Sequence, residues 1–244
     1  MNKNTEIVMV LDRSGSMASC RADTVGGVDV FIQEQKKDGL PTTFTLVLFD
    51  NVIEKPYNGV DIQEVPAFTD ADFVPRGMTA LLDAIGTAIA EVEERHRHLV
   101  PGDRPKIMIA IFTDGQENSS HEYTKDRIKS LVEQKTAEGW TFMFLSASLD
   151  AVAVGSSYGV DYNTVLSTEG MRESMKLYSS GVSMLKSARS VGEVDSIMLG
   201  TVSAQTANYL AHEGKDLDPQ AMAGKLPKGF PLGKVDSLQG SSKP

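Results

Sequence analysis

Short apolar runs alternate along the chain with longer segments in which apolar residues recur every three or four positions. The short runs predict strands and the longer segments predict amphipathic helices. Strands are expected at residues 7–11, 43–49, 107–112 and 140–145, with edge strands at 52–54 and 164–166. Helices are expected at residues 24–38, 80–97, 124–138, 150–158 and 169–189. This alternation predicts an α/β fold with a doubly wound, mostly parallel sheet and helices on both faces.

The last predicted helix carries an apolar stripe formed by Met171, Met175, Tyr178, Val182 and Leu185. Packing of this stripe against the sheet is the simpler interpretation, and a dimer seam or partner surface is the alternative. After Arg189 apolar residues become sparse, and Gly, Ser, Lys, Asp and Pro dominate. We therefore predict a domain at residues 1–189 and a flexible or extended tail at 190–244. In that tail Phe230 and Leu232 could instead anchor a docking peptide.

The strand expected at residues 7–11 ends abruptly in Asp12-Arg13-Ser14-Gly15-Ser16. One carboxylate and two hydroxyls thus follow directly on a buried strand. These are the hard oxygen ligands that Mg²⁺ prefers over nitrogen or sulfur. The motif predicts part of a metal site, although each serine alone could equally be a turn former or a helix cap.

Two further oxygen-bearing residues occupy comparable positions downstream. Thr79 precedes the helix expected at residues 80–97, and Asp114 follows the strand expected at 107–112. In an open parallel sheet, ligands bind beyond the carboxyl ends of the strands, where the winding direction reverses. If the strands that end near Asp12 and Asp114 are neighbours, their carboxylates face each other across that crevice.

Taken together, these positions resemble the metal-ion-dependent adhesion site of von Willebrand factor A (VWA) domains, which combines a D-x-S-x-S motif with a distal Thr and a distal Asp. The resemblance extends over about residues 5–165. It implies Mg²⁺ as the bound ion, with Mn²⁺ as the alternative, and an open coordination position for an Asp or Glu of a partner protein. The implied metal ligands are Asp12, Ser14, Ser16, Thr79 and Asp114.

The same loops carry side chains that would surround the ion and select the partner. We predict this partner-binding rim to consist of Arg13, Met17, Arg76, Met78, Gln116, Glu117, Asn118 and His121. His121 is assigned to the rim because a hard Mg²⁺ site does not favour imidazole. The resemblance to small stand-alone VWA proteins of bacteria and phages implies an adaptor, with AAA+ ATPases and stress-operon proteins as possible partners.

Composition excludes several other classes of function. A net charge of −9 and a pI near 5.0 argue against nucleic acid as a partner, because phosphate neutralisation needs clustered Lys and Arg. Cys20 is the sole cysteine, so no intramolecular disulfide and no thiolate metal site can form. Neither a signal-peptide core nor a membrane-spanning apolar run is evident. These features predict a cytoplasmic protein with no membrane partner.

Two enzymatic alternatives compete with a non-catalytic module. Gly155-Ser156-Ser157-Tyr158-Gly159 has the spacing of a serine hydrolase elbow with Ser157 as nucleophile, but it falls in a helix-like segment. Its partners would be Asp195 and His212. A metal-dependent phosphatase or nuclease would use the same ion, yet position 14 is Ser rather than Asp and no obvious proton-transfer residue is nearby. We therefore expect no catalytic residues.

Overall fold

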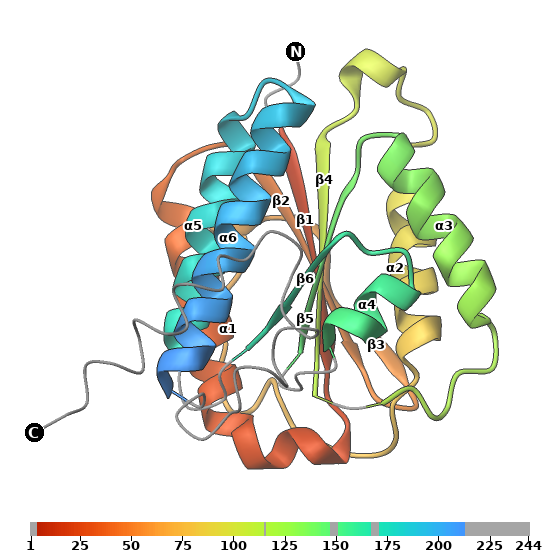
Figure 1. Ribbon diagram of the computed structural model, residues 1–244, viewed down its shortest axis with the longest axis vertical. Helices are drawn as coiled ribbons and strands as arrows, with labels where there is room; N and C mark the ends of the chain where they lie inside the picture. The colour runs from red at the N-terminus through yellow and green to blue at the C-terminus, as the bar shows by residue number, and fades with distance from the viewer. Residues whose placement is uncertain (1–3, 115, 147–150, 167–170, 213–244) are drawn as a thin grey trace, which may run out of the picture.

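A six-stranded sheet forms the centre of the computed structural model, which describes residues 4–114, 116–146, 151–166 and 171–212 (Figure 1). The strands are β1 (Thr5–Asp12), β2 (Thr42–Phe49), β3 (Ile53–Asp61), β4 (Lys106–Thr113), β5 (Thr141–Ser146) and β6 (Tyr162–Val165). Their order is β3-β2-β1-β4-β5-β6, and only β3 is antiparallel to its neighbour. The predicted doubly wound α/β fold is confirmed.

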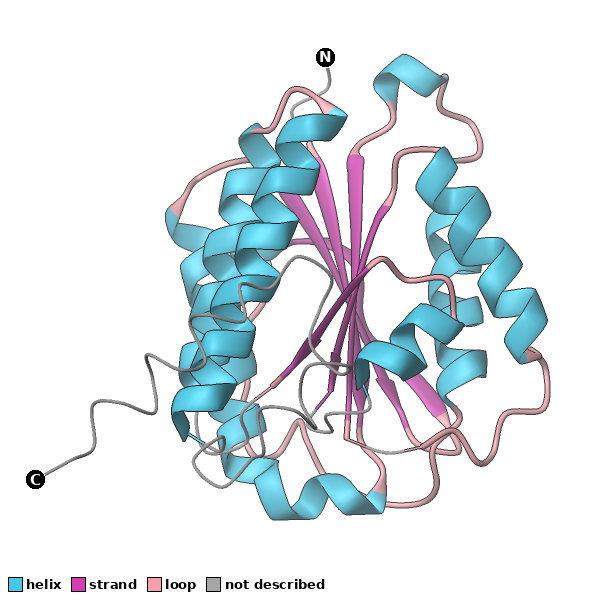
Figure 2. Cartoon of the chain, viewed as in Figure 1, coloured by secondary structure: helices cyan, strands magenta, loops and turns pink. Residues whose placement is uncertain are grey.

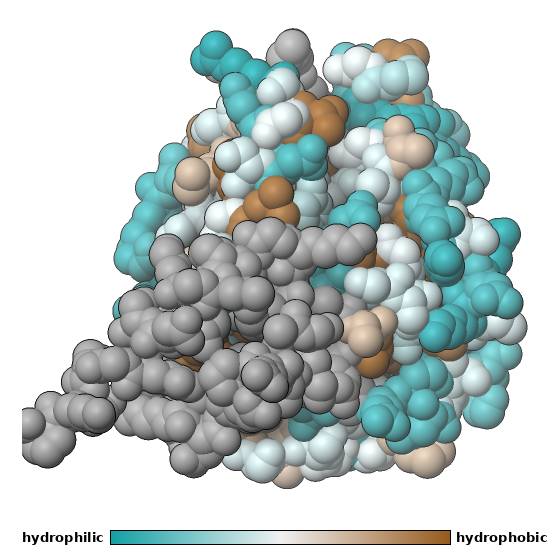
Figure 3. All heavy atoms as spheres, viewed as in Figure 1, coloured by the Kyte–Doolittle hydropathy of each residue, from teal (hydrophilic) through white to brown (hydrophobic). Residues whose placement is uncertain are grey.

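Helices cover both faces of this sheet (Figures 1 and 2). One face is covered by α1 (Arg21–Lys37), α5 (Met171–Ser187) and α6 (Val191–His212), and the other by α2 (Leu81–His96), α3 (Lys125–Ala137) and α4 (Ala151–Ser157). Short 3₁₀ helices occupy Gly15–Cys20, Ile62–Glu64 and Pro101–Asp103. Hydrophilic residues gather over α3 in Figure 3. None of the helices in the described ranges has the length and apolar character that crossing a bilayer requires.

The central strands are buried on both faces, and their side chains alternate between two hydrophobic cores. In β1, Ile7, Met9 and Leu11 pack under α1 and α5, whereas Val8 and Val10 pack under α2. This alternation follows from the two-residue period of a strand. The same arrangement in β4 explains why both sequence segments read as unbroken apolar runs.

The apolar stripe of α5 faces the sheet. Its five members, from Met171 to Leu185, are each at most 4% exposed and belong to the core beneath α1. Tyr178 stacks on Phe31 of α1 with ring centroids 5.1 Å apart. The packing interpretation of this stripe is therefore confirmed, and the stripe is not free to form a dimer seam.

The edge strand β3 is longer than predicted. The sequence suggested only residues 52–54, whereas the strand continues to Asp61 and passes through Pro56. Proline is compatible with an edge strand, where its missing N–H can face solvent. The pairing of β3 with β2 also shifts register between Phe44 and Leu48, so the strand lacks the regular pairing of the central strands.

The prediction of an extended tail directly after residue 189 is wrong for residues 191–212. These residues form α6, which packs on α5 and β6. The amide of Gln205 donates to the Ser174 carbonyl at 2.6 Å, and Thr164 on β6 donates to the Val202 carbonyl. Close approach of the two helices occurs at Gly181, where an added Cβ would lie 2.3 Å from Oγ1 of Thr201. The predicted anchors Phe230 and Leu232 lie outside the described residues.

A local signal for the start of α6 is present in the sequence. Ser190 caps the helix, because its Oγ accepts the Glu193 N–H at 3.2 Å. The Glu193 carboxylate accepts the N–H of Arg189, the residue before the cap. The helix shows little amphipathic periodicity, because its own small and apolar residues are spread over all of its faces. In this helix Val191 and Leu199 are nevertheless exposed, whereas Met198, Val202 and Leu210 are buried.

Replacing Met198 by Ala is expected to lower the free energy of unfolding by about 2–5 kcal/mol, because Met198 is 1% exposed and the substitution leaves a cavity. The adjacent Leu199 is 53% exposed, so Leu199→Ala should change stability by less than about 0.5 kcal/mol. Urea denaturation of the two variants measures the difference. Equal and small effects would show that α6 does not pack as described.

Candidate metal centre

Strands β1 and β4 lie side by side at the topological switch of the sheet. Leu11 pairs with Phe112 in parallel register, so the chain continues on both strands at the same carboxyl edge. Oγ1 of Thr113 donates to Oδ2 of Asp12 at 2.6 Å. Asp12 and Asp114 therefore come from adjacent strand ends, so the condition under which their carboxylates share one crevice is met.

The residues after β1 connect Asp12 to Asp114 through a chain of hydrogen bonds. Oδ1 of Asp12 accepts the Ser14 N–H at 2.7 Å, which turns the backbone sharply after the strand. Oγ of Ser14 lies 3.1 Å from Oγ of Ser16, and Ser16 donates to Oδ1 of Asp114 at 2.8 Å. Four of the five predicted ligands thus lie in one continuous cluster of oxygen atoms.

The fifth predicted ligand, Thr79, is on the loop before α2, which contacts the loop after β1. The Gly15 N–H donates to the Gly77 carbonyl at 3.3 Å, and the Arg76 N–H donates to the Arg13 carbonyl at 2.8 Å. Thr79 is buried, and its N–H donates to Oδ1 of Asn118 on the third loop at 2.8 Å. The three loops that sequence analysis associated with a metal site therefore converge.

Two carboxylates hold together the loop before α2 and the loop after β4. The sequence analysis did not assign them this anchoring role. Glu117 accepts the Leu82 N–H at the start of α2, and Asp83 accepts the N–H groups of His121, Glu122 and Tyr123. Both act as anchors at a helix N-terminus, where unpaired N–H groups favour negative charge. Asp83 in the first turn of α2 was the available sequence signal, since acids are favoured at that position.

A cluster of four ion-paired residues lies beside the first two loops. Asp50, which follows β2, is fully buried and pairs with Arg13 at 3.1 Å and with Arg76 at 2.9 Å. Glu54 on β3 pairs with both arginines. Hydrogen bonds from Arg13 lower the pKa of Glu54 to about 2, so this carboxyl is ionised at neutral pH. The cluster ties the Asp12 and Thr79 loops to the edge of the sheet.

The predicted rim divides into exposed and buried side chains. Met78 is 54% exposed, and Arg76 on the same loop is exposed as well. Gln116 and His121, on the loop after β4, are also exposed. Asn118 is exposed but uses its amide oxygen on Thr79, while Glu117 is half-buried.

The rim prediction is wrong for Met17 and Arg13, because neither side chain is exposed. Met17 is 3% exposed and lies in the core beneath α1. Arg13 is 5% exposed and points into the ion-paired cluster rather than toward a partner. Alternation along the extended segment after β1 explains the Arg13 result: its neighbours Asp12 and Ser14 contribute to the oxygen cluster, and Arg13 points away from it.

The donor set fits a hard divalent cation. Burial raises the pKa of Asp12 and of Asp114, and hydrogen bonds from Thr113, Ser14 and Ser16 oppose that rise. Within the described ranges, no Lys or Arg side chain neutralises either carboxylate; their partners are hydroxyl and backbone N–H groups. Two buried carboxylates surrounded by neutral hydroxyls are suited to a cation that brings its own positive charge.

The hydrolase alternative does not have the required geometry. Ser157 is the last residue of α4, and its hydroxyl donates to the Val154 carbonyl at 2.6 Å. Asp195 accepts the Tyr162 hydroxyl, and the side chain of His212 lies outside the described atoms. Because a nucleophile elbow needs a sharp turn directly after a strand, the elbow interpretation of residues 155–159 is wrong.

Gly77 is needed for the approach of the second loop. Its φ is +68°, and an added Cβ would lie 2.1 Å from Oδ1 of Asn51. Gly77→Ala is expected to cost about 1–3 kcal/mol through backbone strain and this contact. Gly102 has open space around it, so Gly102→Ala is the matched control and should be nearly neutral in urea denaturation. An unchanged stability of Gly77→Ala would contradict the loop geometry.

No family model and no curated protein matches this sequence. Among solved structures, a von Willebrand factor type A protein from Catenulispora acidiphila matches with a TM-score of 0.56 and 16% identity, covering 75% of this chain and 43% of that chain. The PilB minor pilin from Streptococcus sanguinis, as its D319A mutant, matches with a TM-score of 0.55 and 12% identity over 74% and 61% of the two chains. Proximal thread matrix protein 1 from the mussel byssus matches with a TM-score of 0.50 and 14% identity over 82% and 47%.

This chain therefore spans less than two thirds of the length of each of these similar structures. The identities are low, so the likeness concerns the fold. The fold of this protein is VWA-like, with the six-stranded sheet and flanking helices described above.

Proposed function

We propose that this protein is a metal-dependent interaction module that binds an acidic residue of a partner protein. The observation that carries the proposal is the oxygen cluster joining Asp12, Ser14, Ser16 and Asp114 at the carboxyl edge of the sheet. A VWA-like fold supports it, since the cluster lies where the crevice of an open α/β sheet opens. The similar structures include a minor pilin and a matrix protein, neither of which is named as an enzyme.

The five predicted ligands would hold Mg²⁺, or Mn²⁺ in its place. Asp12 and Asp114 supply negative charge, and Ser14, Ser16 and Thr79 supply neutral hydroxyl oxygens. When bound, the ion would offer a Lewis-acidic position to one oxygen from outside the chain. Because two carboxylates only balance a divalent ion, an additional anionic oxygen is favoured there. A partner's Asp or Glu has the required chemistry.

The exposed rim would then select among acidic partners. The Arg76 side chain is 52% exposed beside the crevice, and Met78 presents an apolar surface on the same loop. A cation next to an apolar patch suits an acidic side chain with apolar neighbours. By resemblance to small VWA proteins, AAA+ ATPases and stress-operon proteins are the partners to examine first.

We propose no turnover at this site. A phosphatase or nuclease would need a nucleophile or base next to the metal. The hydroxyls of Ser14 and Ser16 are instead bonded within the cluster, and His121, the histidine of the predicted rim, is exposed. The module would act by binding alone.

Water-proton relaxation of the Mn²⁺-loaded protein tests the proposal. Mn²⁺ bound at this site should retain exchangeable waters and enhance relaxation. A short peptide containing Glu should displace one water and lower the enhancement, whereas the same peptide with Gln should not. If the two peptides act equally, no acidic ligand is recognised through the metal. Capture from the native host with Mg²⁺ or with chelator then identifies the natural partner.

A further inference from the structure

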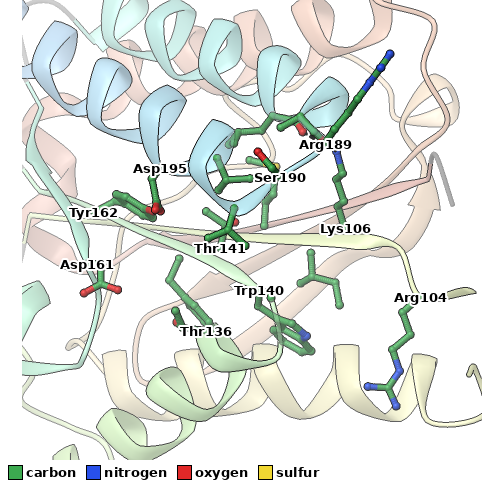
Figure 4. Close-up of a pocket in the computed structure, with 18 of the residues that line it drawn as sticks. Arg104, Lys106, Thr136, Trp140, Thr141, Asp161, Tyr162, Arg189, Ser190 and Asp195 are labelled. Atoms are coloured by element: carbon green, nitrogen blue, oxygen red, sulfur yellow. Dashed lines mark hydrogen bonds between the residues drawn. The ribbon is translucent and has the colours of Figure 1, made fainter. Parts of the chain in front are cut away.

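A second concave site lies at the opposite edge of the sheet, where β4, β5 and β6 begin (Figure 4). Its volume is about 490 Å³, within the range of roughly 300–1,000 Å³ that holds a drug-sized ligand, so it has room for more than one large side chain. The end of α3 borders it on one side, and the junction of α5 and α6 borders it on the other. It is therefore separate from the candidate metal centre at the carboxyl edge.

The walls of this cavity are mainly apolar. Met108, Leu185 and Val194 contribute from the core beneath α5, and Trp140 and Phe142 contribute from the core beneath α2. The rings of Trp140 and Phe142 stack with centroids 6.3 Å apart and an interplanar angle of 19°. Such walls favour an apolar occupant, because the removal of apolar surface from water is favourable.

The charged side chains around the cavity do not form a site for a charged ligand. Lys106 donates its ammonium protons to three carbonyls at the end of α5. In Figure 4, Arg104 and Arg189 extend away from the cavity in different directions. Asp195 accepts the Tyr162 hydroxyl. The walls therefore select an occupant by its apolar surface rather than by its charge.

Helix α6 begins at this cavity and carries the chain away from it. Val191, its first residue, lines the cavity and is 77% exposed, so apolar surface continues to the mouth. At the other end of the helix, Asn208 donates to Oγ of Ser174 in the first turn of α5, at the carboxyl edge of the sheet (Figure 1). The 22 residues of α6 span about 33 Å. A later segment that returns to the cavity must cover this distance.

The sequence beyond His212, the last residue that the structure describes, contains a segment of suitable chemistry and reach. Its large apolar side chains are most concentrated in Leu226-Pro227-Lys228-Gly229-Phe230-Pro231-Leu232. Extended chain covers about 3.3 Å per residue, so residues 213–225 can span about 40 Å, which is more than the length of α6. Each proline restricts the residue before it to extended backbone, which lowers the entropy lost when Leu226 and Phe230 dock.

We propose that residues 226–232 of this chain return along α6 and fill the cavity, with Phe230 and Leu232 against Trp140 and Phe142. The chain's own segment is the favoured occupant, because a tether gives it an effective concentration on the order of millimolar beside the cavity. An aromatic and an aliphatic side chain match walls that are themselves aromatic and aliphatic. This inference is independent of the metal proposal and concerns the other edge of the sheet.

Trp140 provides the readout, because it is the only tryptophan of the chain and lines the cavity. In the full chain, Phe230→Ser/Leu232→Ser should raise the quenching of Trp140 fluorescence by acrylamide and shift the emission to longer wavelength, because water then enters the cavity. Val235→Ser/Leu238→Ser is the matched control, since it also removes two apolar side chains beyond His212, and it should change neither quantity. Chelator is present throughout, so the outcome does not depend on the metal centre.

A synthetic peptide of residues 224–234 measures whether the cavity is already filled. It should bind the Phe230→Ser/Leu232→Ser protein saturably and restore the low quenching of Trp140. It should bind the wild type about tenfold or more weakly, because the tethered segment competes with it. The same peptide with both serine substitutions should not bind either protein.

Val191→Asp tests the proposal from the side of the cavity. This position is exposed, so the protein should remain folded, and the charge at the mouth should raise Trp140 quenching as Phe230→Ser/Leu232→Ser does. Leu199→Asp is the matched control, because Leu199 is 53% exposed on the same helix and does not line the cavity.

Equal quenching of Trp140 in the wild type and the Phe230→Ser/Leu232→Ser protein would overturn the proposal, as would equal affinity of the two proteins for the peptide. Quenching that depends on protein concentration would also overturn it, because the occupant would then come from a second copy.

Discussion

Asp12→Asn is expected to abolish Mg²⁺ and Mn²⁺ binding while the protein remains folded. Asp12 is fully buried and forms one end of the oxygen cluster, where it accepts hydrogen bonds from the Ser14 N–H and the Thr113 hydroxyl. Its loss removes one of the two negative charges that the proposed site offers a cation. Even outer partners of metal ligands cost about 10–100-fold in affinity when removed, so loss of a charged ligand should exceed ~100-fold.

The fold should survive because asparagine has nearly the same shape and can reproduce both local hydrogen bonds. The amide oxygen can accept the Ser14 N–H, and the amide nitrogen can donate to Oγ1 of Thr113 if that hydroxyl reverses its role. Burial already disfavours the charged form of Asp12, as its raised pKa indicates. Removing the charge therefore does not remove a net stabilising ion pair.

Titration calorimetry with each ion, together with circular dichroism, measures the two parts of this prediction. Asp103→Asn is a matched control, because Asp103 lies in the short helix that precedes β4 at the other edge of the sheet. The control should bind the ions as the wild type does. Retained affinity in Asp12→Asn would show that Asp12 is not a metal ligand, whatever the convergence of the loops.

Asp50→Ala should produce the largest loss of stability among the substitutions considered. Asp50 is fully buried and pairs with Arg13, whose side chain is 6% exposed. Without Asp50 the buried guanidinium of Arg13 keeps only the half-exposed Glu54 as a partner, and breaking a buried pair in this way costs about 3–5 kcal/mol. Asp50 also accepts the Val52 N–H at 2.7 Å, so the turn after β2 loses a hydrogen bond as well. Urea denaturation at neutral pH measures the change.

Arg76→Ala gives the matched contrast on the same carboxylate. Its side chain is 52% exposed, and exposed ion pairs contribute only about 0–1 kcal/mol because water and salt screen them. Asp50 would keep its buried partner Arg13 in this variant. A cost for Arg76→Ala that equals that of Asp50→Ala would mean that burial does not determine the strength of this cluster.

Residues near the site show which kind of prediction the sequence can support. Asp12, Ser14 and Ser16 could be grouped because they follow one strand within a short motif, and Asp114 because it follows another strand. Arg13 and Met17 belong to the same stretch, yet one enters the ion-paired cluster and the other enters the core. A sequence neighbour of a site residue shares its loop but not the direction of its side chain.

The residues that anchor the loops to one another could not be predicted from the local sequence. Asp83 and Asn118 bind backbone groups on loops that are distant in sequence, so no local pattern could pair them. Helix α6 is an intermediate case. Its capping residue, Ser190, was present in the sequence, but its packing against α5 depends on Gly181 and Thr201 meeting across two helices.

The sequence by itself determined the fold class, the order of the strands and main helices as far as α5, and the oxygen-bearing residues at the strand ends. Those features follow from local periodicity and from residue chemistry, which are properties of neighbouring positions. Only the tertiary structure decided which loops meet, which rim side chains are exposed, and where the cavity beside Trp140 lies. These depend on contacts between residues far apart in the chain, and their energies arise from burial and pairing that exist only after folding.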